Sequence, residues 1–349
     1  MPRSAELRRE RVLASPRYRD GTFHNTHPVT SGLVQGTRWE VTRSFLFGKE
    51  RRRPPRPLPS GDPRPAWARP ADTGLRATWL GHSTVLLELD GVRVVTDPVW
   101  SARISPFGVL APRRFQPAPV AVADLPPLDA ILVSHDHYDH LDRPTVEALA
   151  AASAAPFVTS LGVGAHLEAW GVPPERIVEL DWWERAELGP VAFTAAPSQH
   201  FSGRAGGRDR TLWSSFAIET ERRRVFFSGD TGLTPEYAEI GARLGPFDLV
   251  MLEVGAFHPA WGHIHLGPEN ALAALELLGG GAFLPVHWGT FNLGLHAWDE
   301  PAEKLVELGG AAQLVMPRLG EAVEPARRPA VVPWWREVGT PELAALPAR

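Results

Sequence analysis

The feature that most constrains this chain is a cluster of histidines and aspartates at residues 134–140. It reads Ser-His-Asp-His-Tyr-Asp-His and directly follows the apolar run Ala130–Val133. An apolar run of this length between polar residues is typical of a buried strand. The cluster therefore begins where a strand passes into a loop, and a strand end holds side chains rigidly enough to bind a metal. Imidazoles crowded in this way have little structural use without a metal ion, so we predict a metal site.

The spacing within the cluster predicts how its side chains share metal ions. His135 and His137 lie two residues apart, so in extended or loop backbone both side chains can point the same way and bind one cation. Asp139 and His140 follow them and are placed to bind a second cation nearby. The chain has no cysteine, and neutral imidazole with carboxylate suits zinc best, with iron or manganese as alternatives.

Three further residues of metal-binding type each follow a short apolar run that is typical of a strand. They are His200, Asp230 and His287. Taken singly, each is more often an ordinary residue, and Gly229–Gly232 around Asp230 could simply be a turn. Together with the cluster, they predict four strand ends that meet at one rim of a sheet assembly and form a single site with seven ligands.

The order of these motifs along the chain resembles the metallo-β-lactamase superfamily. Within it, the chain resembles the branch of N-acyl-phosphatidylethanolamine-hydrolysing phospholipase D. The metal-ligand motifs mark only the superfamily, whereas the blocks Glu-Leu-Asp-Trp-Trp-Glu and His-Trp-Gly-Thr-Phe are specific to the branch. The matching segments span about residues 75 to 295 and are Trp79–Val85, Thr96–Pro98, Ser134–Asp142, Glu179–Glu184, Pro197–His200, Gly229–Gly232, Gly245–Leu249 and His287–Phe291.

The resemblance implies a site with two zinc ions that divide the seven donors between them. The division places His135, His137 and His200 on one ion, Asp139, His140 and His287 on the other, and Asp230 between the two. Such a pair lowers the pKa of a shared water to near neutrality and creates hydroxide as the nucleophile, so no serine or cysteine nucleophile is needed. We therefore assign Asp139 and Asp230 catalytic as well as metal-binding roles.

Three more residues are candidates for supporting this site. Asp97 is expected either to orient a ligand imidazole from behind or to form a turn before Pro98. His82 is expected either to lie behind the ligands or to be an ordinary buried histidine. His265 shares an aromatic, glycine-rich loop with His258 and His263. By the resemblance, His265 lies beside the substrate and is a third catalytic residue, and a solvated loop histidine is the alternative.

The pattern of apolar runs predicts a mixed α and β fold. Thr84–Leu89 and Val92–Thr96 flank Asp-Gly, which is a strong hairpin signal. Further strands are expected near residues 156–160, 177–180, 191–196, 213–220, 224–228, 248–254 and 282–286. Helices are expected near residues 143–152, 161–170, 234–244, 268–279 and 300–308. Periodicity alone does not specify the arrangement, but the resemblance implies an αββα sandwich with an N-terminal extension.

The charge is unevenly distributed along the 349 residues. Residues 1–70 carry 15 basic and 6 acidic side chains, whereas the remainder carries 21 basic and 34 acidic ones. We expect an N-terminal extension over 1–70, a catalytic domain over 71–325 and a C-terminal tail over 326–349. The basic, proline-rich stretch near residues 49–59 is either a solvated connection or an arm that meets an anionic surface, such as phospholipid headgroups or a phosphorylated substrate.

Composition also limits the location and partners of the chain. No apolar stretch approaches the roughly 20 residues of a membrane span, and the N-terminus lacks an apolar signal core. We expect a cytoplasmic, bacterial protein that can lie at the membrane periphery and can form a homodimer. Nucleic acid is not expected as a partner, because the catalytic part is acidic and carries no base-reading motif.

Three functions remain open at this point. The first is a zinc-dependent phosphodiesterase of phospholipase D type, which cleaves N-acyl-phosphatidylethanolamine or a similar phospholipid. The second is another hydrolase on the same scaffold, such as a lactonase related to ascorbate-6-phosphate lactonase, with a small-molecule substrate. The third is a di-iron or other metal-binding protein without hydrolytic activity. The branch-specific blocks favour the first, although they report ancestry more than pocket shape.

Overall fold

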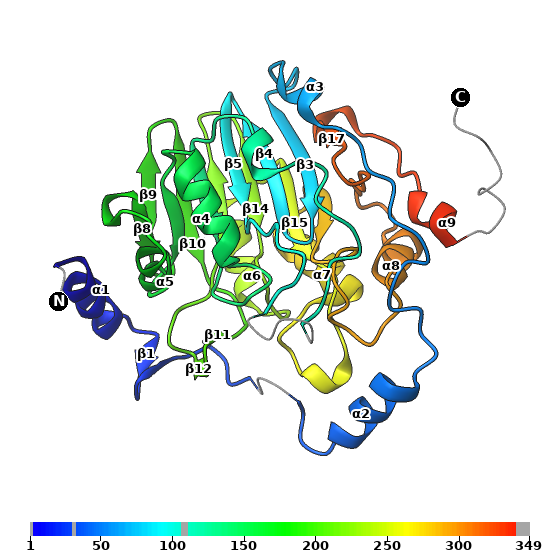
Figure 1. Ribbon diagram of the computed structural model, residues 1–349, viewed down its shortest axis with the longest axis horizontal. Helices are drawn as coiled ribbons and strands as arrows, with labels where there is room; N and C mark the ends of the chain where they lie inside the picture. Colours follow the sequence, from blue (N-terminus) through cyan, green and yellow to red (C-terminus); the bar gives the residue numbers. More distant parts are fainter. Residues whose placement is uncertain (1–2, 30–32, 106–110, 340–349) are drawn as a thin grey trace.

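Two β-sheets form the centre of the molecule, and the computed structural model describes residues 3–29, 33–105 and 111–339 of the chain (Figure 1). The seven-stranded sheet runs in the order β17 (Ala322–Val323), β3 (Leu75–Gly81), β4 (Thr84–Leu89), β5 (Val92–Thr96), β6 (Ala130–Val133), β7 (Phe157–Ser160) and β8 (Ile177–Leu180). The six-stranded sheet runs in the order β16 (Ala282–Val286), β15 (Leu249–Glu253), β14 (Arg224–Phe227), β13 (Ser215–Glu219), β10 (Val191–Ala196) and β9 (Arg185–Leu188).

Strand direction brings the predicted donors to one edge of the sandwich. Strands β5 to β8 are mutually parallel, and so are β14 to β16. The carboxyl ends of parallel strands meet at the same edge of a sheet, which is where α/β proteins build their sites. The histidine cluster follows β6, Asp230 follows β14, and His287 follows β16.

Helices cover the outer face of each sheet, which gives the predicted αββα layers. The elements α4 (Arg143–Ala152) and α5 (Gly164–Ala169) lie over the seven-stranded sheet (Figure 1). The other sheet is covered by α6 (Glu236–Leu244), α7 (Gly267–Leu277) and α8 (Glu300–Leu308). Within the described residues, no helix is long and apolar enough to cross a bilayer.

The central strands are largely apolar on both faces because both faces are covered. Along β4, Val85, Leu87 and Leu89 belong to the core between the sheets, whereas Leu86 belongs to the core beneath α4 and α5. This alternation follows from the two-residue period of a strand. The hairpin predicted around Asp90-Gly91 and the helices predicted after residue 142 are confirmed. The edge strand β9 was not predicted, since its Arg-Ala-Glu-Leu sequence has no apolar run.

The N-terminal segment contains structure that the sequence did not predict. It holds α1 (Arg3–Ala14), the hairpin of β1 (Tyr18–Arg19) and β2 (Thr22–Phe23), α2 (Arg38–Phe47) and α3 (Arg64–Trp67). Arg8 on α1 forms ion pairs with Glu168 at 2.8 Å and Glu179 at 2.5 Å. Leu58, in the proline-rich stretch, is 4% exposed and packs in the central core, so this part of the stretch is not solvated.

The C-terminal segment also packs on the core. In α9 (Trp334–Gly339), Trp334 and Trp335 are buried, and their rings lie 5.7 Å and 5.9 Å from the ring of Trp288. The boundaries at residues 70 and 325 stay predictions, and both terminal segments contact the residues between them. The remaining short elements are β11 (Gly203–Arg204), β12 (Gly207–Arg208), η2 (Val122–Asp124), η3 (Pro174–Arg176), η4 (Pro259–Trp261) and η5 (Pro325–Arg327).

Candidate metal centre

The structure brings all seven predicted donors together at the carboxyl ends of the strands. A first group consists of His135, His137, His200 and Asp230. His137 Nδ1 lies 2.9 Å from His135 Nε2 and 3.2 Å from His200 Nε2. Four ligands around one zinc ion at about 2.0 Å are separated from one another by roughly 3.3 Å. The three imidazoles therefore have the spacing of ligands to a single tetrahedral ion.

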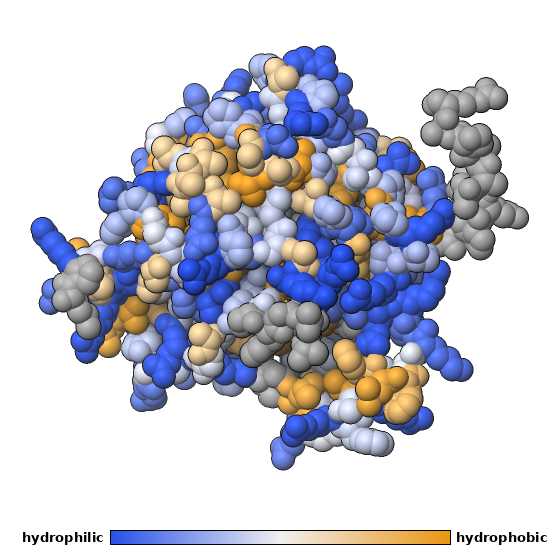
Figure 2. Space-filling view, in the orientation of Figure 1, coloured by the Kyte–Doolittle hydropathy of each residue, from blue (hydrophilic) through white to orange (hydrophobic). Residues whose placement is uncertain are grey.

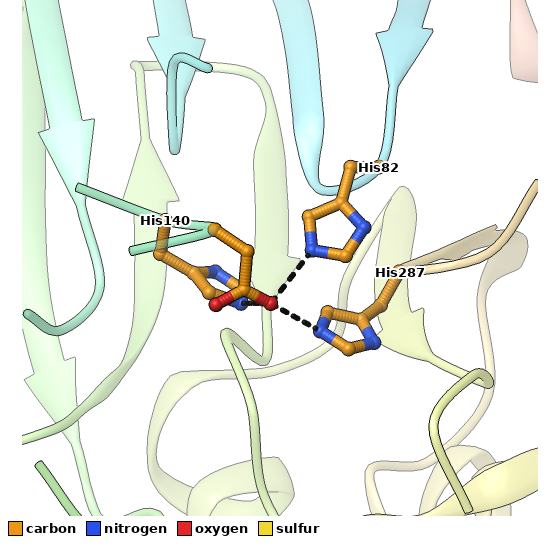
Figure 3. Close-up of side chains that lie close together, drawn as sticks. His82, His140 and His287 are labelled. Atoms are coloured by element: carbon orange, nitrogen blue, oxygen red, sulfur yellow. Dashed lines mark hydrogen bonds and ion pairs between the residues drawn. The ribbon is translucent and has the colours of Figure 1, made fainter. Parts of the chain in front are cut away.

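A second group lies directly beside the first and includes His140 and His287. Their Nε2 atoms lie 3.5 Å and 3.3 Å from Asp139 Oδ2, and Figure 3 shows His82, His140 and His287 turned toward this carboxylate. The Asp230 Oδ2 atom lies 3.1 Å from His140 Nε2 and 3.2 Å from His287 Nε2. It also lies within 4.0 Å of the first group's His135. Asp230 is thus located between the two groups.

Several buried polar atoms in the centre fit bound cations. His140 Nε2, His287 Nε2 and Asp230 Oδ1 are fully buried and accept or donate no hydrogen bond within the described residues. The two nitrogens contact only carboxylate oxygens of the cluster, and Asp230 Oδ1 has no partner among the described residues, which costs about 1–3 kcal/mol for a buried polar atom. Because these atoms point into a cluster of further donors, coordination of metal ions satisfies them at once.

Hydrogen bonds behind the imidazoles hold the rings in place. His140 Nδ1 lies 2.6 Å from Asp97 Oδ2, and His135 Nδ1 lies 2.9 Å from Ser134 Oγ. Asp97 also accepts from the backbone and hydroxyl of Ser134, so it joins two strand ends. His200 Nδ1 donates to the carbonyl of Ile264 at 2.9 Å. With the Nδ1 atoms occupied, Nε2 is left free for a metal, which is the usual arrangement of ligand histidines.

The backbone is strained at several of these positions. His82, Asp97 and His287 have φ values of 55°, 33° and 64°, in the left-handed region that residues other than glycine seldom adopt. Such conformations cost of order 1–3 kcal/mol each and are concentrated at functional sites. Gly229 has φ of 55°, and a Cβ there would lie 2.7 Å from the Ser134 side chain, so only glycine allows this turn.

The electrostatics of the centre hold His135, His200, Asp139 and Asp230 in metal-binding form, whereas His140 and His287 must lose a proton to bind a cation. Burial lowers the pKa values of these two rings, but Asp230 and Asp139 raise them by more, well above the ordinary value for His140 and to about 10 for His287. Burial holds the pKa values of His135 and His200 well below the ordinary range, so both rings are neutral. Burial opposes ionisation of Asp139 and Asp230, but the charges of neighbouring histidines, chiefly His140, outweigh it and hold both pKa values well below usual. Neutral imidazole and ionised carboxylate are the forms that coordinate divalent metals.

His82, predicted to lie behind the ligands or to be simply buried, lies against the second group. Its Nε2 is 3.1 Å from Asp139 Oδ2, and its ring centroid is 4.1 Å from that of His287 (Figure 3). Burial, with the nearby His287, lowers the pKa of His82 to about 3, so the ring is neutral. His82 is therefore placed to orient Asp139, and this role stays a prediction.

The histidines of the 256–265 loop are separated by the structure. His265 lines the pocket above the donors, and its Nδ1 lies 3.0 Å from Glu253 Oε2. His263 is exposed, and the His258 side chain accepts a hydrogen bond from the backbone of Ala260. Of the three, only His265 faces the site.

Two supporting residues were not found by sequence reasoning. Glu253, at the end of β15, is fully buried and accepts hydrogen bonds from the backbone of Thr231 and Leu266 as well as from His265. Glu253 follows an apolar run, as the predicted donors do, so its position in the sequence could have identified it as part of the site. Asn25 donates to the carbonyl of His200 at 2.7 Å and accepts from its N–H at 3.0 Å. Nothing in the sequence links residue 25 to the ligands.

A pocket of about 330 Å³ opens above the centre. Its floor is formed by His137, Asp139, His200, Asp230, His265 and His287. Its walls are apolar and are formed by Leu33, Phe201, Ala256, Trp261, Ile264 and Leu293. Among the described residues that line it, none is an arginine or a lysine.

Comparisons with known proteins agree with this geometry. The Beta-lactamase superfamily domain matches residues 92–288. An uncharacterized protein of Mycobacterium tuberculosis is 45% identical, covering 92% of this chain and 88% of its own. N-acyl-phosphatidylethanolamine-hydrolyzing phospholipase D 1 of Caenorhabditis elegans is 38% identical, covering 70% of this chain and 72% of its own. An isothiocyanate hydrolase from Delia radicum gut bacteria shares the fold, with a TM-score of 0.58 at 22% identity over 71% of this chain and 98% of its own.

The family match and the relative from C. elegans confirm the resemblance predicted from the sequence. The chain is a metal-dependent hydrolase of the metallo-β-lactamase superfamily, in the branch that includes N-acyl-phosphatidylethanolamine-hydrolysing phospholipase D.

Proposed function

We propose that the chain is a zinc-dependent phosphodiesterase of phospholipase D type that acts on N-acyl-phosphatidylethanolamine or a similar phosphodiester. The observation that supports this most strongly is a floor of metal donors under apolar pocket walls. The donors suit two cations, and the walls suit a substrate with an apolar part next to the reacting group. The similarity to the relative from C. elegans points to the same substrate class.

Each donor has a proposed role in holding the cations. His135, His137 and His200 hold one ion, Asp139, His140 and His287 hold the other, and Asp230 lies between them. When bound, the two cations lower the pKa of water toward neutrality and neutralise charge on the phosphoryl group. Nitrogen and oxygen donors without thiolate favour zinc, with iron or manganese as the alternatives.

His265 is proposed to contact the substrate. Glu253 accepts from Nδ1 of this ring, so Nε2 is the atom that remains for a bound phosphodiester. Burial lowers the pKa of His265, but the adjacent Glu253 raises it by more, and the net pKa lies above the ordinary value. A protonated ring donates to a phosphoryl or leaving-group oxygen, which supports departure of the alcohol.

The pocket walls favour a lipid phosphodiester over the lactone of a sugar phosphate. A sugar phosphate carries hydroxyls and a second anionic group, which need polar partners and a cation away from the metals. The described lining offers aromatic and aliphatic side chains there and no arginine or lysine. An acyl or diacylglycerol chain fits such walls, because burial of apolar surface contributes about 25 cal/mol per Å².

The test offers three substrate classes in parallel to the zinc-loaded, full-length protein: N-acyl-phosphatidylethanolamine, bis(p-nitrophenyl) phosphate and a set of lactones. We expect phosphatidic acid and N-acylethanolamine from the lipid. In water enriched in oxygen-18, the label should enter phosphatidic acid, because attack occurs at phosphorus. Turnover of lactones alone would exclude the phosphodiesterase assignment, and iron with no ester hydrolysis would favour a non-hydrolytic protein.

Variants test whether the donors hold the metals. Asp230→Ala and His137→Ala should each lose bound metal, measured by elemental analysis, and should lose turnover of every substrate. The matched control is His263→Ala, which changes an exposed histidine of the pocket loop and should retain both metal and turnover. Full activity in Asp230→Ala would contradict the two-metal site.

A further inference from the structure

A short helix with several exposed apolar side chains lies near the entrance to the site. The helix α2 (Arg38–Phe47) has no buried residue. Trp39, Phe45, Leu46 and Phe47 are 75%, 59%, 64% and 76% exposed. Figure 1 shows α2 apart from the sandwich, and Figure 2 shows the apolar patch that it forms at this end of the molecule.

This concentration of apolar surface is unusual for the chain. Half of the large apolar side chains that are exposed among the described residues lie between Leu33 and Phe47. Single exposed apolar residues are normal on a protein surface, but a contiguous group marks an interaction site. In addition, helices shorter than about 12–15 residues are marginal in water without packing, and α2 has 10 residues. Both observations indicate that another surface covers α2.

Charge identifies the kind of surface. Residues 38–53 contain six basic side chains and two acidic ones. A symmetric contact between two copies of the chain would bring this positive segment against itself, which is unfavourable. An anionic phospholipid surface matches it, and aromatic side chains beside arginine and lysine are typical of segments that lie at such a surface.

The position of α2 connects this surface to the pocket. Leu33 lines the pocket, and the backbone N–H of Val34 donates to the carbonyl of Ala260 in the opposite pocket loop at 2.8 Å. Helix α2 begins four residues after Val34 and lies at the same end of the sandwich as that loop (Figure 1). The exposed apolar residues therefore continue from the pocket wall onto the molecular surface.

We infer that α2 and residues 48–53 dock on a membrane surface that contains anionic phospholipid, with Trp39, Phe45 and Phe47 inserted among the headgroups. The choice of a lipid surface rests in part on the proposed lipid substrate, but docking is a separate event from hydrolysis. It delivers a membrane lipid to the apolar pocket wall without passage through water.

Binding is measured by co-sedimentation of the full-length, zinc-loaded protein with vesicles that contain no N-acyl-phosphatidylethanolamine. We expect binding to phosphatidylcholine vesicles with 30% phosphatidylglycerol. Binding to pure phosphatidylcholine vesicles, or to the anionic vesicles at high salt, should be weaker by about tenfold or more, because several basic side chains contact the anionic lipid. The variant Trp39→Ser/Phe45→Ser/Phe47→Ser should lose at least about tenfold in affinity for the anionic vesicles. The matched control, Leu277→Ser/Leu308→Ser, removes two exposed leucines on α7 and α8 and should bind as the parent does.

A single labelled site locates the contact. Because the chain has no cysteine, Phe47→Cys introduces a unique thiol for an environment-sensitive fluorophore. Its emission should shift to the blue with anionic vesicles, whereas the same label at Leu308→Cys should not respond. Unchanged binding of the triple serine variant, or a dimer in sedimentation velocity that this variant abolishes, would overturn the inference. Turnover of a water-soluble phosphodiester should stay unchanged in that variant, so a failure of docking is distinct from a failure of the proposed function.

Discussion

The amide of Asn25 makes two hydrogen bonds to the backbone of the proposed ligand His200 and a third to Trp213. Its Oδ1 accepts from Trp213 Nε1 at 3.0 Å, in addition to the N–H of His200. A side-chain amide that pairs with both the N–H and the C=O of one residue restricts the φ and ψ angles of that residue. Asn25 thus fixes the backbone from which one proposed metal ligand projects.

We predict that Asn25→Ala weakens metal binding by about 10–100-fold, the usual effect of removing a residue that supports a ligand. The substitution leaves buried backbone groups of His200 without partners, so the ligand is held less firmly. Competition with a chromophoric chelator measures the affinity, and the visible spectrum of the cobalt-substituted protein reports the geometry. The metal affinity of Asn25→Asp should lie between those of the parent protein and Asn25→Ala, because aspartate keeps the hydrogen-bond acceptor and loses the donor. Equal affinity in all three proteins would mean that Asn25 is only structural.

Among individual residues, the sequence predicts the metal-binding side chains better than it predicts the residues that hold them in place. His135 to His140 are recognisable because their spacing alone indicates a metal. Asn25 and Glu253 have ordinary neighbours in sequence, and their roles arise from contacts with residues 175 and 12 positions away. Such contacts depend on the tertiary fold, which local patterns do not encode.

Among the elements, helix α9 is stabilised by contacts with α8. Glu303 on α8 accepts hydrogen bonds from Trp335 Nε1 at 2.8 Å and from Arg336. The hydrogen bond from Arg336 is the main reason that the pKa of Glu303 lies below its usual value of 4.5. The ionised carboxylate is therefore the form that the folded protein prefers.

The sign of this shift predicts a dependence of stability on pH. A carboxyl whose pKa is lower in the folded state stabilises the protein above the unfolded pKa, and this contribution is lost as the pH falls through the folded pKa. Glu303→Gln should therefore lower the free energy of unfolding at pH 7 and have a smaller effect well below pH 4.5. Urea unfolding of both proteins in chelator at the two pH values measures the difference. An equal loss at both pH values would contradict the role of the charge.

Elements with one apolar face or a clear turn could be predicted from the sequence. The hairpin at Asp90-Gly91 and the helix α6 are of this kind. The helices α1 and α2 were missed because neither buries a residue, so neither carries the apolar stripe that marks a helix in a core. Their positions depend on ion pairs for α1 and, by our inference, on a membrane for α2.

For the whole molecule, bound metal should contribute to stability. The donors come from both sheets, and in the unfolded chain they are dispersed, so metal binds the folded state far more tightly. At free zinc equal to 100 times Kd, this adds about 2.7 kcal/mol to the free energy of unfolding. Calorimetry with zinc and with chelator should show a higher melting temperature with zinc. Asp230→Ala should show no such increase, and identical melting in zinc and chelator for the parent protein would contradict the prediction.

The spread of the donors along the chain has a consequence for its synthesis. While the chain leaves the ribosome, His135 emerges long before Asp230, and His287 emerges after β16, as the last donor. The first group of donors can close once β14 has folded, but the second cannot form until residue 287 is free of the exit tunnel. Asn25 cannot contact His200 until that residue, 175 positions later in the chain, has been synthesised. The predicted centre is therefore completed late, and nascent chains that stop before residue 287 lack one of its seven donors.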